Sequence, residues 1–337
     1  AHAEPPASGR AALAALAARD PALAALFDGS AHGPAPLAEG EADAAPVGAD
    51  PIPGWMVPLI GELVDGEERA ALLQRAPLHV RANGLRIARE DLLARLPGAA
   101  PLLNTPHGLA LPEGTALEGS AEWQAGVLEV QDAGSQIIAA ACGAKPGQTV
   151  LDLCAGAGGK TLALAADMGG QGRLVAADVN RDRLARLAPR AARAGAHFIE
   201  TLLLDGNREE EALAPLTEAC DVVLVDAPCT GMGTWRRNPE SRWRLSPDAI
   251  ARACALQARV LNLAAPLVMP GGLLVYAVCS LLDSEGRERA DAFLRDLPGW
   301  KAEKSDWGGR EWGNGVLLTA KHDASDGFFF ARLRKPC

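Results

Sequence analysis

Apolar and helical segments alternate regularly from Gln136 to the end of the chain. Short runs rich in Val, Leu and Ala predict strands, and longer stretches with apolar residues three or four positions apart predict helices. This alternation is typical of βαβ units and predicts a doubly wound α/β sheet of mainly parallel strands. The expected strands are 149–153, 173–178, 197–204, 222–226 and 272–278, with closing strands at 300–303 and 328–333. The expected helices are 161–168, 181–193, 209–216, 247–268 and 285–294.

Ahead of the sheet the pattern is shorter and more mixed, which predicts a small α+β module. Residues 10–27 have helical spacing, and residues 28–53 are rich in Pro, Gly, Ala and acids, as in a linker. We therefore divide the chain into an N-terminal helix with linker (1–50), the module (51–135) and the sheet domain (136–337). Within the module the expected helices are 58–74 and 89–96, and the expected strands are 78–82, 109–111 and 125–130.

Composition narrows the class of protein. Of the 337 residues, 48% are hydrophobic, which supports a globular core, and no apolar run is long enough to span a bilayer. The seven cysteines are an odd number without any C-x-x-C spacing, so we expect neither a disulfide framework nor a metal site. Free thiols and the absence of a signal-peptide pattern predict a cytoplasmic protein.

The net charge of −9 argues against a protein that simply coats nucleic acid, but it leaves room for a local basic patch. Residues 236–259 carry six arginines, with Trp235 and Trp243 among them. This segment is either a solvated arginine-rich helix start or a contact for nucleic acid.

A glycine-rich turn follows the first strand of the sheet domain. The strand ends at Cys154, and the turn then reads Ala155, Gly156, Ala157, Gly158, Gly159, Lys160, Thr161. A P-loop would require glycine where Cys154 stands, and a dinucleotide fingerprint begun at Gly156 would require glycine in place of Thr161. The turn still exposes backbone N–H groups to a ligand.

S-adenosylmethionine has no pyrophosphate and asks less of such a turn. Its ribose hydroxyls need an acid at the end of the second strand, where Asp178 stands. Asp205, at the end of the third strand, is placed to reach the adenine edge. Ligands of open α/β sheets bind at the carboxyl ends of the strands, so we expect the cofactor there.

Two cysteines follow the fourth and fifth strands. Cys229 comes after Asp226-Ala-Pro, and Cys279 ends Tyr-Ala-Val-Cys. Carbon 5 of cytosine is a poor nucleophile until a thiolate adds at carbon 6, and an acid such as Asp226 can stabilise the developing charge. This chemistry accommodates either cysteine as the nucleophile.

With these motifs the chain resembles the RNA cytosine-C5 methyltransferases of the Sun/Fmu (RsmB) and Nop2/NSUN type, over residues 51–336. The resemblance implies a Rossmann-like class I methyltransferase sheet preceded by a small RNA-binding module. It also implies that Cys279 is the nucleophile, that Cys229 helps to release the product, and that Lys160 lies close to Asp226. The matching motifs are 130–136, 151–161, 226–231, 236–240, 276–280 and 326–330.

The resemblance assigns cofactor contacts to the turn, Cys154 to Lys160, and to Asp178, Asp205 and Asp226. The sequence departs from the family at Val278, where Thr is usual, and at Ala157, where many members have Pro. Bacterial ribosomal members also carry a full helical RNA-binding domain ahead of the module.

The resemblance further implies an RNA partner. We expect 16S ribosomal RNA, with tRNA as the alternative substrate, and a monomer without a membrane partner. A noncatalytic ribosome-assembly protein with the same fold is the competing interpretation.

Overall fold

The computed structural model describes residues 9–18, 20–30, 33–41 and 52–337, and it divides into two compact units, Ala1–Pro58 and Leu59–Cys337. In the first unit α1 (Gly9–Ala17) and α2 (Pro21–Ala24) replace the single helix expected over 10–27. Asp20 accepts the N–H of Ala22 at 2.9 Å and so starts a new helix. The linker predicted at 28–53 lies partly on residues 31–32 and 42–51, outside the described residues.

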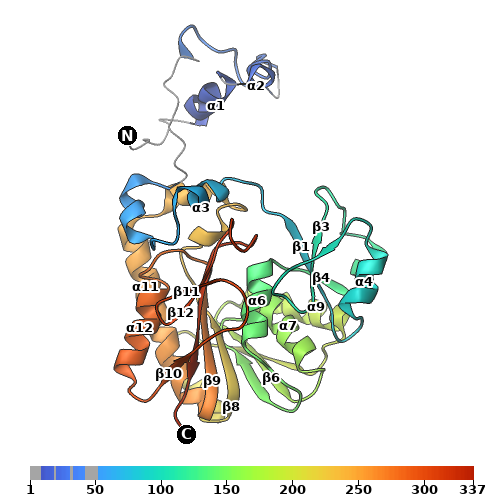
Figure 1. Cartoon of the computed structure of the whole chain (residues 1–337), viewed down its shortest axis with the longest axis vertical. Helices are drawn as coiled ribbons and strands as arrows, with labels where there is room; N and C mark the ends of the chain where they lie inside the picture. Colours follow the sequence, from blue (N-terminus) through green and yellow to red (C-terminus); the bar gives the residue numbers. More distant parts are fainter. Residues whose placement is uncertain (1–8, 19, 31–32, 42–51) are drawn as a thin grey trace. The chain divides into compact units, whose positions relative to one another are not determined.

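The second unit is built on a nine-stranded sheet, seen nearly edge-on in the lower part of Figure 1. Eight of its strands run in the order β11-β12-β13-β9-β8-β5-β6-β7, and β10 pairs with β13. The five strands from β9 to β7 are parallel, as the sequence predicts. Their bounds are β5 (Thr149–Asp152), β6 (Arg173–Asp178), β7 (Ile199–Leu203), β8 (Cys220–Asp226) and β9 (Val268–Val278).

The closing strands are antiparallel. The predicted pair, β10 (Lys301–Glu303) and β13 (Phe328–Arg334), is confirmed. A hairpin of β11 (Arg310–Trp312) and β12 (Gly315–Leu318), which the sequence analysis did not predict, pairs with the first half of β13.

Helices cover both faces of this sheet (Figure 1). One face packs its alternate apolar side chains against α6, α7 and α9, and α11 packs against β8 and β9 on the other. The helices are α6 (Ala133–Ala141), α7 (Gly159–Asp167), α8 (Arg181–Ala185), α9 (Leu187–Ala194), α10 (Glu209–Leu213), α11 (Pro247–Ala264) and α12 (Arg287–Asp296). Short 3-10 turns are η3 (Ala214–Leu216), η4 (Met232–Thr234), η5 (Pro239–Arg244) and η6 (Ala265–Leu267).

A second, four-stranded antiparallel sheet precedes the large one, in the order β2-β3-β1-β4. Its elements are α3 (Gly66–Ala71), β1 (Leu78–Ala82), α4 (Arg89–Arg95), β2 (Ala100–Pro101), β3 (Gly108–Leu111), α5 (Ala121–Gln124) and β4 (Leu128–Val130). The helix predicted over 58–74 is wrong in extent, because only η2 (Gly54–Leu59) and α3 form there. Between them Ile60 bridges to Leu282, and a Cβ on Gly61 would approach the Trp312 ring to 2.7 Å.

The small sheet is joined to the glycine-rich turn after β5 by charged and polar side chains. The buried Glu129 of β4 forms ion pairs with Arg190 and Arg193 of α9. Arg190 also donates to the carbonyl of Ala157 at 2.5 Å, and Gln131 donates to the carbonyl of Gly159 at 3.2 Å. Residues of the module therefore help to hold the turn after β5.

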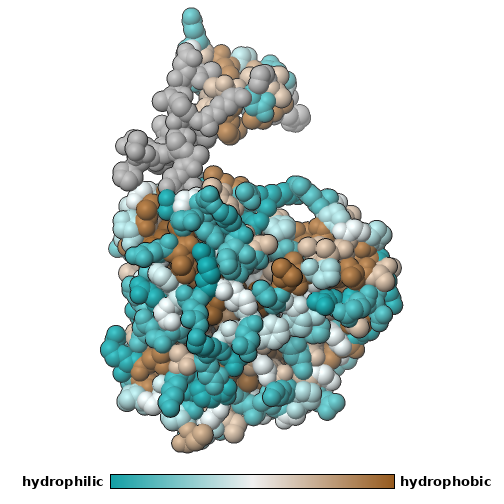
Figure 2. All heavy atoms as spheres, in the orientation of Figure 1, coloured by the Kyte–Doolittle hydropathy of each residue, from teal (hydrophilic) through white to brown (hydrophobic). Residues whose placement is uncertain are grey.

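The surface of this unit is mostly hydrophilic on the face shown in Figure 2, with apolar residues in small separate patches. None of the helices in the described part of the chain is long and apolar enough to cross a membrane.

Candidate active site

The carboxyl ends of β5, β6, β8 and β9 open onto a cavity of about 620 Å³, a volume suited to a small organic ligand. Five of the predicted site residues line it: Cys154, Asp178, Asp226, Cys229 and Cys279. The other predicted cofactor contacts, residues 155–160 of the turn and the exposed Asp205, do not line it. The sequence analysis missed other lining residues, among them Val179, Asn180, Arg183, Glu209, Leu256 and Arg259.

The turn between β5 and α7 depends on glycine. Gly158 has φ +82°, in the left-handed region, and directly precedes α7. A Cβ at this position would lie 2.2 Å from Cδ1 of the fully buried Leu187. The turn can therefore keep its shape only with glycine at 158.

Asp178 fastens this turn to the end of β6. Its Oδ2 accepts the N–H of Gly156 at 2.7 Å, and its Oδ1 accepts the N–H of Asn180 at 2.7 Å. A carboxylate has about four lone-pair sites, so Asp178 retains acceptors toward the cavity that it lines.

Lys160 and Asp226 form the ion pair that the resemblance implies. Lys160 Nζ lies 2.6 Å from Asp226 Oδ2 and 5.5 Å from the centre of the Phe328 ring. Burial works to lower the pKa of Lys160, but the charge and hydrogen bond of Asp226 outweigh it, and the pKa is raised. The lysine is therefore a fixed cation next to the cavity.

Cys229 and Cys279 are in contact, with their sulfur atoms 3.2 Å apart. Strands β8 and β9 are parallel neighbours, so the two loops leave the same edge of the sheet. The hydrogen bond to Cys279 and burial raise the pKa of Cys229 well above its ordinary value. Lys160, in contrast, interacts electrostatically with Cys279. Of the two thiols, Cys229 is therefore the one whose pKa is raised, and the two sulfurs share a hydrogen bond.

A buried carboxylate, Glu285, lies behind the two cysteines and was not singled out from the sequence. It accepts hydrogen bonds from Thr230 and Ser280, the residues that follow Cys229 and Cys279. A glutamate six positions after a cysteine carries no signal by itself.

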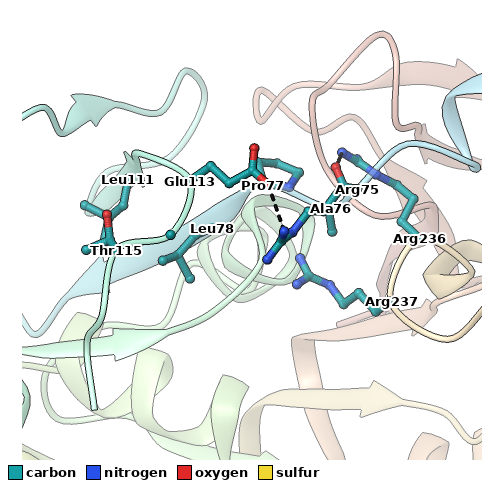
Figure 3. A pocket seen from close by; sticks show the side chains of 10 residues that line it. Arg75, Ala76, Pro77, Leu78, Leu111, Glu113, Thr115, Arg236 and Arg237 are labelled. Atoms are coloured by element: carbon teal, nitrogen blue, oxygen red, sulfur yellow. Dashed lines mark hydrogen bonds and ion pairs between the residues drawn. The ribbon is translucent and has the colours of Figure 1, made fainter. Parts of the chain in front are cut away.

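The basic segment after Cys229 borders a second hollow, also of about 620 Å³ (Figure 3). Arg237 donates to Asp326 at 2.6 Å and to Asp132 at 3.1 Å. Arg236 donates to two main-chain carbonyls, those of Ser325 and Arg75. Both arginines therefore have structural partners, whereas the side chain of Arg75, 78% exposed, reaches across the hollow to Glu113 at 2.8 Å.

Comparison with known proteins identifies the family of this chain. Residues 139–334 match the family described as 16S rRNA methyltransferase RsmB/F. The chain is 34% identical over 304 residues to a probable ribosomal RNA small subunit methyltransferase B of Synechocystis, covering 84% of this chain and 67% of the relative. It is 39% identical over 213 residues to ribosomal RNA small subunit methyltransferase B of Thermus thermophilus, covering 62% of this chain and 50% of the relative.

A solved structure also matches this chain. The structure of a methyltransferase homologue from Pyrococcus horikoshii superimposes with a TM-score of 0.70 at 28% identity, covering 79% of this chain and 89% of that one. This match confirms the Rossmann-like methyltransferase fold. The chain spans half to two thirds of the length of the two curated relatives. On the match over residues 139–334, this chain belongs to the 16S rRNA methyltransferase RsmB/F family.

Proposed function

We propose that this protein transfers a methyl group from S-adenosylmethionine to carbon 5 of a cytosine in RNA, with Cys279 as the nucleophile. The observation that carries the proposal is the pair of touching thiols, Cys229 and Cys279, which line one cavity together with Asp226. Folding does not require a buried ion pair beside two free thiols, whereas addition to a pyrimidine uses each of these groups.

The cavity suits S-adenosylmethionine, which supplies an electrophilic methyl group when bound. Asp178 offers carboxylate acceptors for ribose hydroxyls beside the glycine turn. Val179 lines the cavity with its side chain 59% exposed, an apolar surface that suits a purine ring. Asp205 is flanked by two residues that line the cavity, Leu204 and Gly206, and we propose that it contacts the adenine edge from there.

The protein groups then have distinct roles. The Cys279 sulfur adds to carbon 6 of cytosine, and its electron pair makes carbon 5 nucleophilic toward the methyl group. Asp226, in its ion pair with Lys160, accepts a hydrogen bond from the cytosine amino group, and the pair supplies a proton to N3 as negative charge develops there. After methyl transfer, water takes the proton from carbon 5, the C5–C6 double bond forms again, N3 returns its proton, and the Cys279 sulfur leaves with the electron pair of the C6–S bond. The departing sulfur then receives the hydrogen bond of the Cys229 thiol.

We propose 16S ribosomal RNA as the substrate, because two curated relatives are named for the small ribosomal subunit. In this proposal residues 51–135 contribute RNA contacts, residues 136–337 carry catalysis, and the chain works as a cytoplasmic monomer.

The test incubates the protein and S-adenosylmethionine with 16S rRNA or with tRNA and maps 5-methylcytosine by mass spectrometry. We expect a methylated cytosine in 16S rRNA. Methylation of tRNA alone would overturn the substrate, and methylation of neither RNA would overturn the activity.

Arg75→Ala should weaken RNA binding. Its exposed guanidinium borders the hollow of Figure 3 and is paired there with the exposed Glu113, so a phosphate can compete for it. Loss of one phosphate contact should make the slope of log affinity against log salt shallower by about 0.7–0.9. Affinity measured between 50 and 200 mM salt, by fluorescence anisotropy, checks this.

The matched control is Glu113→Ala, which removes the competing carboxylate and should leave RNA affinity equal or higher. Equal weakening by both substitutions would mean that the ion pair, and not the arginine charge, matters. Cofactor affinity should be unchanged in both variants, since neither residue lines the cofactor cavity.

A further inference from the structure

Glu285 is a fully buried carboxylate at the junction of three segments of the chain. Thr230 donates to it twice, from its N–H at 2.9 Å and from its hydroxyl at 2.5 Å. Ser280 donates from its hydroxyl at 2.5 Å, and Gln257 of α11 donates from its side-chain amide at 2.9 Å. Two oxygens thus receive four donors.

Burial of this carboxylate carries an unfavourable desolvation free energy, which a role in packing alone would not explain. Burying a charge costs several kcal/mol unless hydrogen bonds or an ion pair compensate it. Over the described part of the chain, no lysine, arginine or histidine lies within 4.0 Å of Glu285, so the four donors carry the compensation. The four neutral donors must therefore keep their positions, because each lost hydrogen bond leaves the desolvation free energy of the charge uncompensated.

Those donors lie next to the two thiols. Thr230 directly follows Cys229, and Ser280 directly follows Cys279, so one carboxylate is shared by both cysteine loops. Gln257 extends the connection, since its amide also donates to the carbonyl of Pro228 at 3.1 Å, just before Cys229.

We propose that Glu285 is a positioning residue that binds the two cysteine loops to each other and thereby holds the Cys229 and Cys279 sulfurs in contact. Its catalytic consequence rests on the proposed function, because only a reaction that uses both thiols needs this contact. The contact itself can be measured without RNA or cofactor.

The charge has a second effect on the same pair. The ionisable groups that act on the Cys229 thiol are Cys279 and Glu285, and Tyr276 of β9 is coupled to it in turn. The negative charge of Glu285 disfavours a second anion at Cys229 and helps to keep the pKa of that thiol high. Glu285 thus adds to the hydrogen bond from Cys279 and to burial, which are the larger causes of the raised pKa of Cys229.

Phenylarsine oxide provides the test, because its arsenic binds two thiols that lie close together and releases one water. Wild-type protein should capture one arsenical, detected by mass spectrometry, and Cys229→Ser or Cys279→Ser should each abolish capture. Glu285→Gln keeps the shape but turns one acceptor into a donor that faces other donors. We expect at least tenfold weaker capture. The control Glu288→Gln changes an exposed carboxylate of α12 and should bind as the wild type does.

Methylation kinetics give the second readout. In Glu285→Gln we expect kcat to fall about 10²-fold, since a displacement of about 1 Å at reacting groups has this effect, while KM for the cofactor stays the same. A folded Glu285→Gln protein with wild-type capture and wild-type kcat would overturn the proposal. If capture falls while even the wild type methylates no RNA, the proposed function fails and the positioning role stands.

A milder pair of substitutions serves if Glu285→Gln does not fold. Thr230→Val removes one hydroxyl donor and keeps the branched shape, whereas Thr230→Ser keeps the donor. Capture should be weaker in Thr230→Val than in Thr230→Ser. The reverse order, or equal capture, would contradict a role for hydrogen bonds to Glu285.

Discussion

Cys279→Ala is expected to abolish methyl transfer and to form no covalent RNA adduct, while Cys229→Ala is expected to accumulate one. Cys279 is the sulfur proposed to add to carbon 6, and its removal should lower the rate by at least about 10³-fold, because no other group adds there. The hydrogen bond to Cys279 and burial raise the pKa of Cys229, which favours a role as proton donor to the departing sulfur, so without Cys229 the C6–S bond should break slowly. Denaturing gels with labelled RNA separate the two outcomes.

The control for both variants is Cys254→Ala. Cys254 is a partly buried thiol whose Sγ donates to the carbonyl of Ser284 at 3.3 Å, and it does not line the cofactor cavity. The Cys254→Ala variant should methylate RNA at close to the wild-type rate. An adduct with Cys279→Ala and none with Cys229→Ala would exchange the two roles.

Gly158→Ala is expected to remove cofactor binding almost completely. The methyl group would force a left-handed alanine, which costs about 1–2 kcal/mol, and would overlap the buried Leu187, which adds about 1–3 kcal/mol. A displaced turn would disturb the hydrogen bond from the N–H of Gly156 to Asp178, so we expect at least 100-fold weaker binding of S-adenosylmethionine. Calorimetry measures the affinity, and urea unfolding measures the free energy of unfolding.

Gly143→Ala separates backbone strain from overlap. Gly143 has φ +60°, and nothing lies within 4 Å of the Cβ position. Alanine there should cost about 1 kcal/mol of stability and leave cofactor affinity unchanged. If Gly158→Ala and Gly143→Ala lowered the affinity for the cofactor equally, general destabilisation rather than the shape of the turn would be responsible.

Most of the parallel strands could be predicted because β5, β6 and β8 are short apolar runs that are largely buried. Segment 173–178 even has the predicted bounds, since Asp178 ends it with a polar residue. The hairpin β11–β12 gave no such signal, because β11 has no buried residue and lies at the edge of the sheet. The apolar positions of 58–74 fit a helix, yet contacts from Leu282 and Trp312, more than 200 residues away, override the local preference.

Some features of the candidate site could also be predicted from the sequence, and others could not. Acids and thiols at strand ends could be predicted, because parallel strands bring their carboxyl ends to one edge. The raised pKa of Cys229 could not, since it comes from the hydrogen bond to Cys279 and from burial, with a smaller contribution from the charge of Glu285. The role of Glu285 depends on hydrogen bonds from segments that only the fold brings together. RsmB/F family membership, predicted from the motifs, is confirmed by the comparisons.

The link between the small sheet and the cofactor turn has a thermodynamic consequence. Glu129 of β4 binds Arg190, which in turn holds the carbonyl of Ala157, so a shift of the small sheet is transmitted to the turn. If RNA stabilises one position of that sheet, it changes the affinity for S-adenosylmethionine by some factor. Reciprocity then requires the cofactor to change the affinity for RNA by the same factor. Binding of either substrate would then change the affinity for the other, through the contacts of Arg190 and Gln131 with the turn.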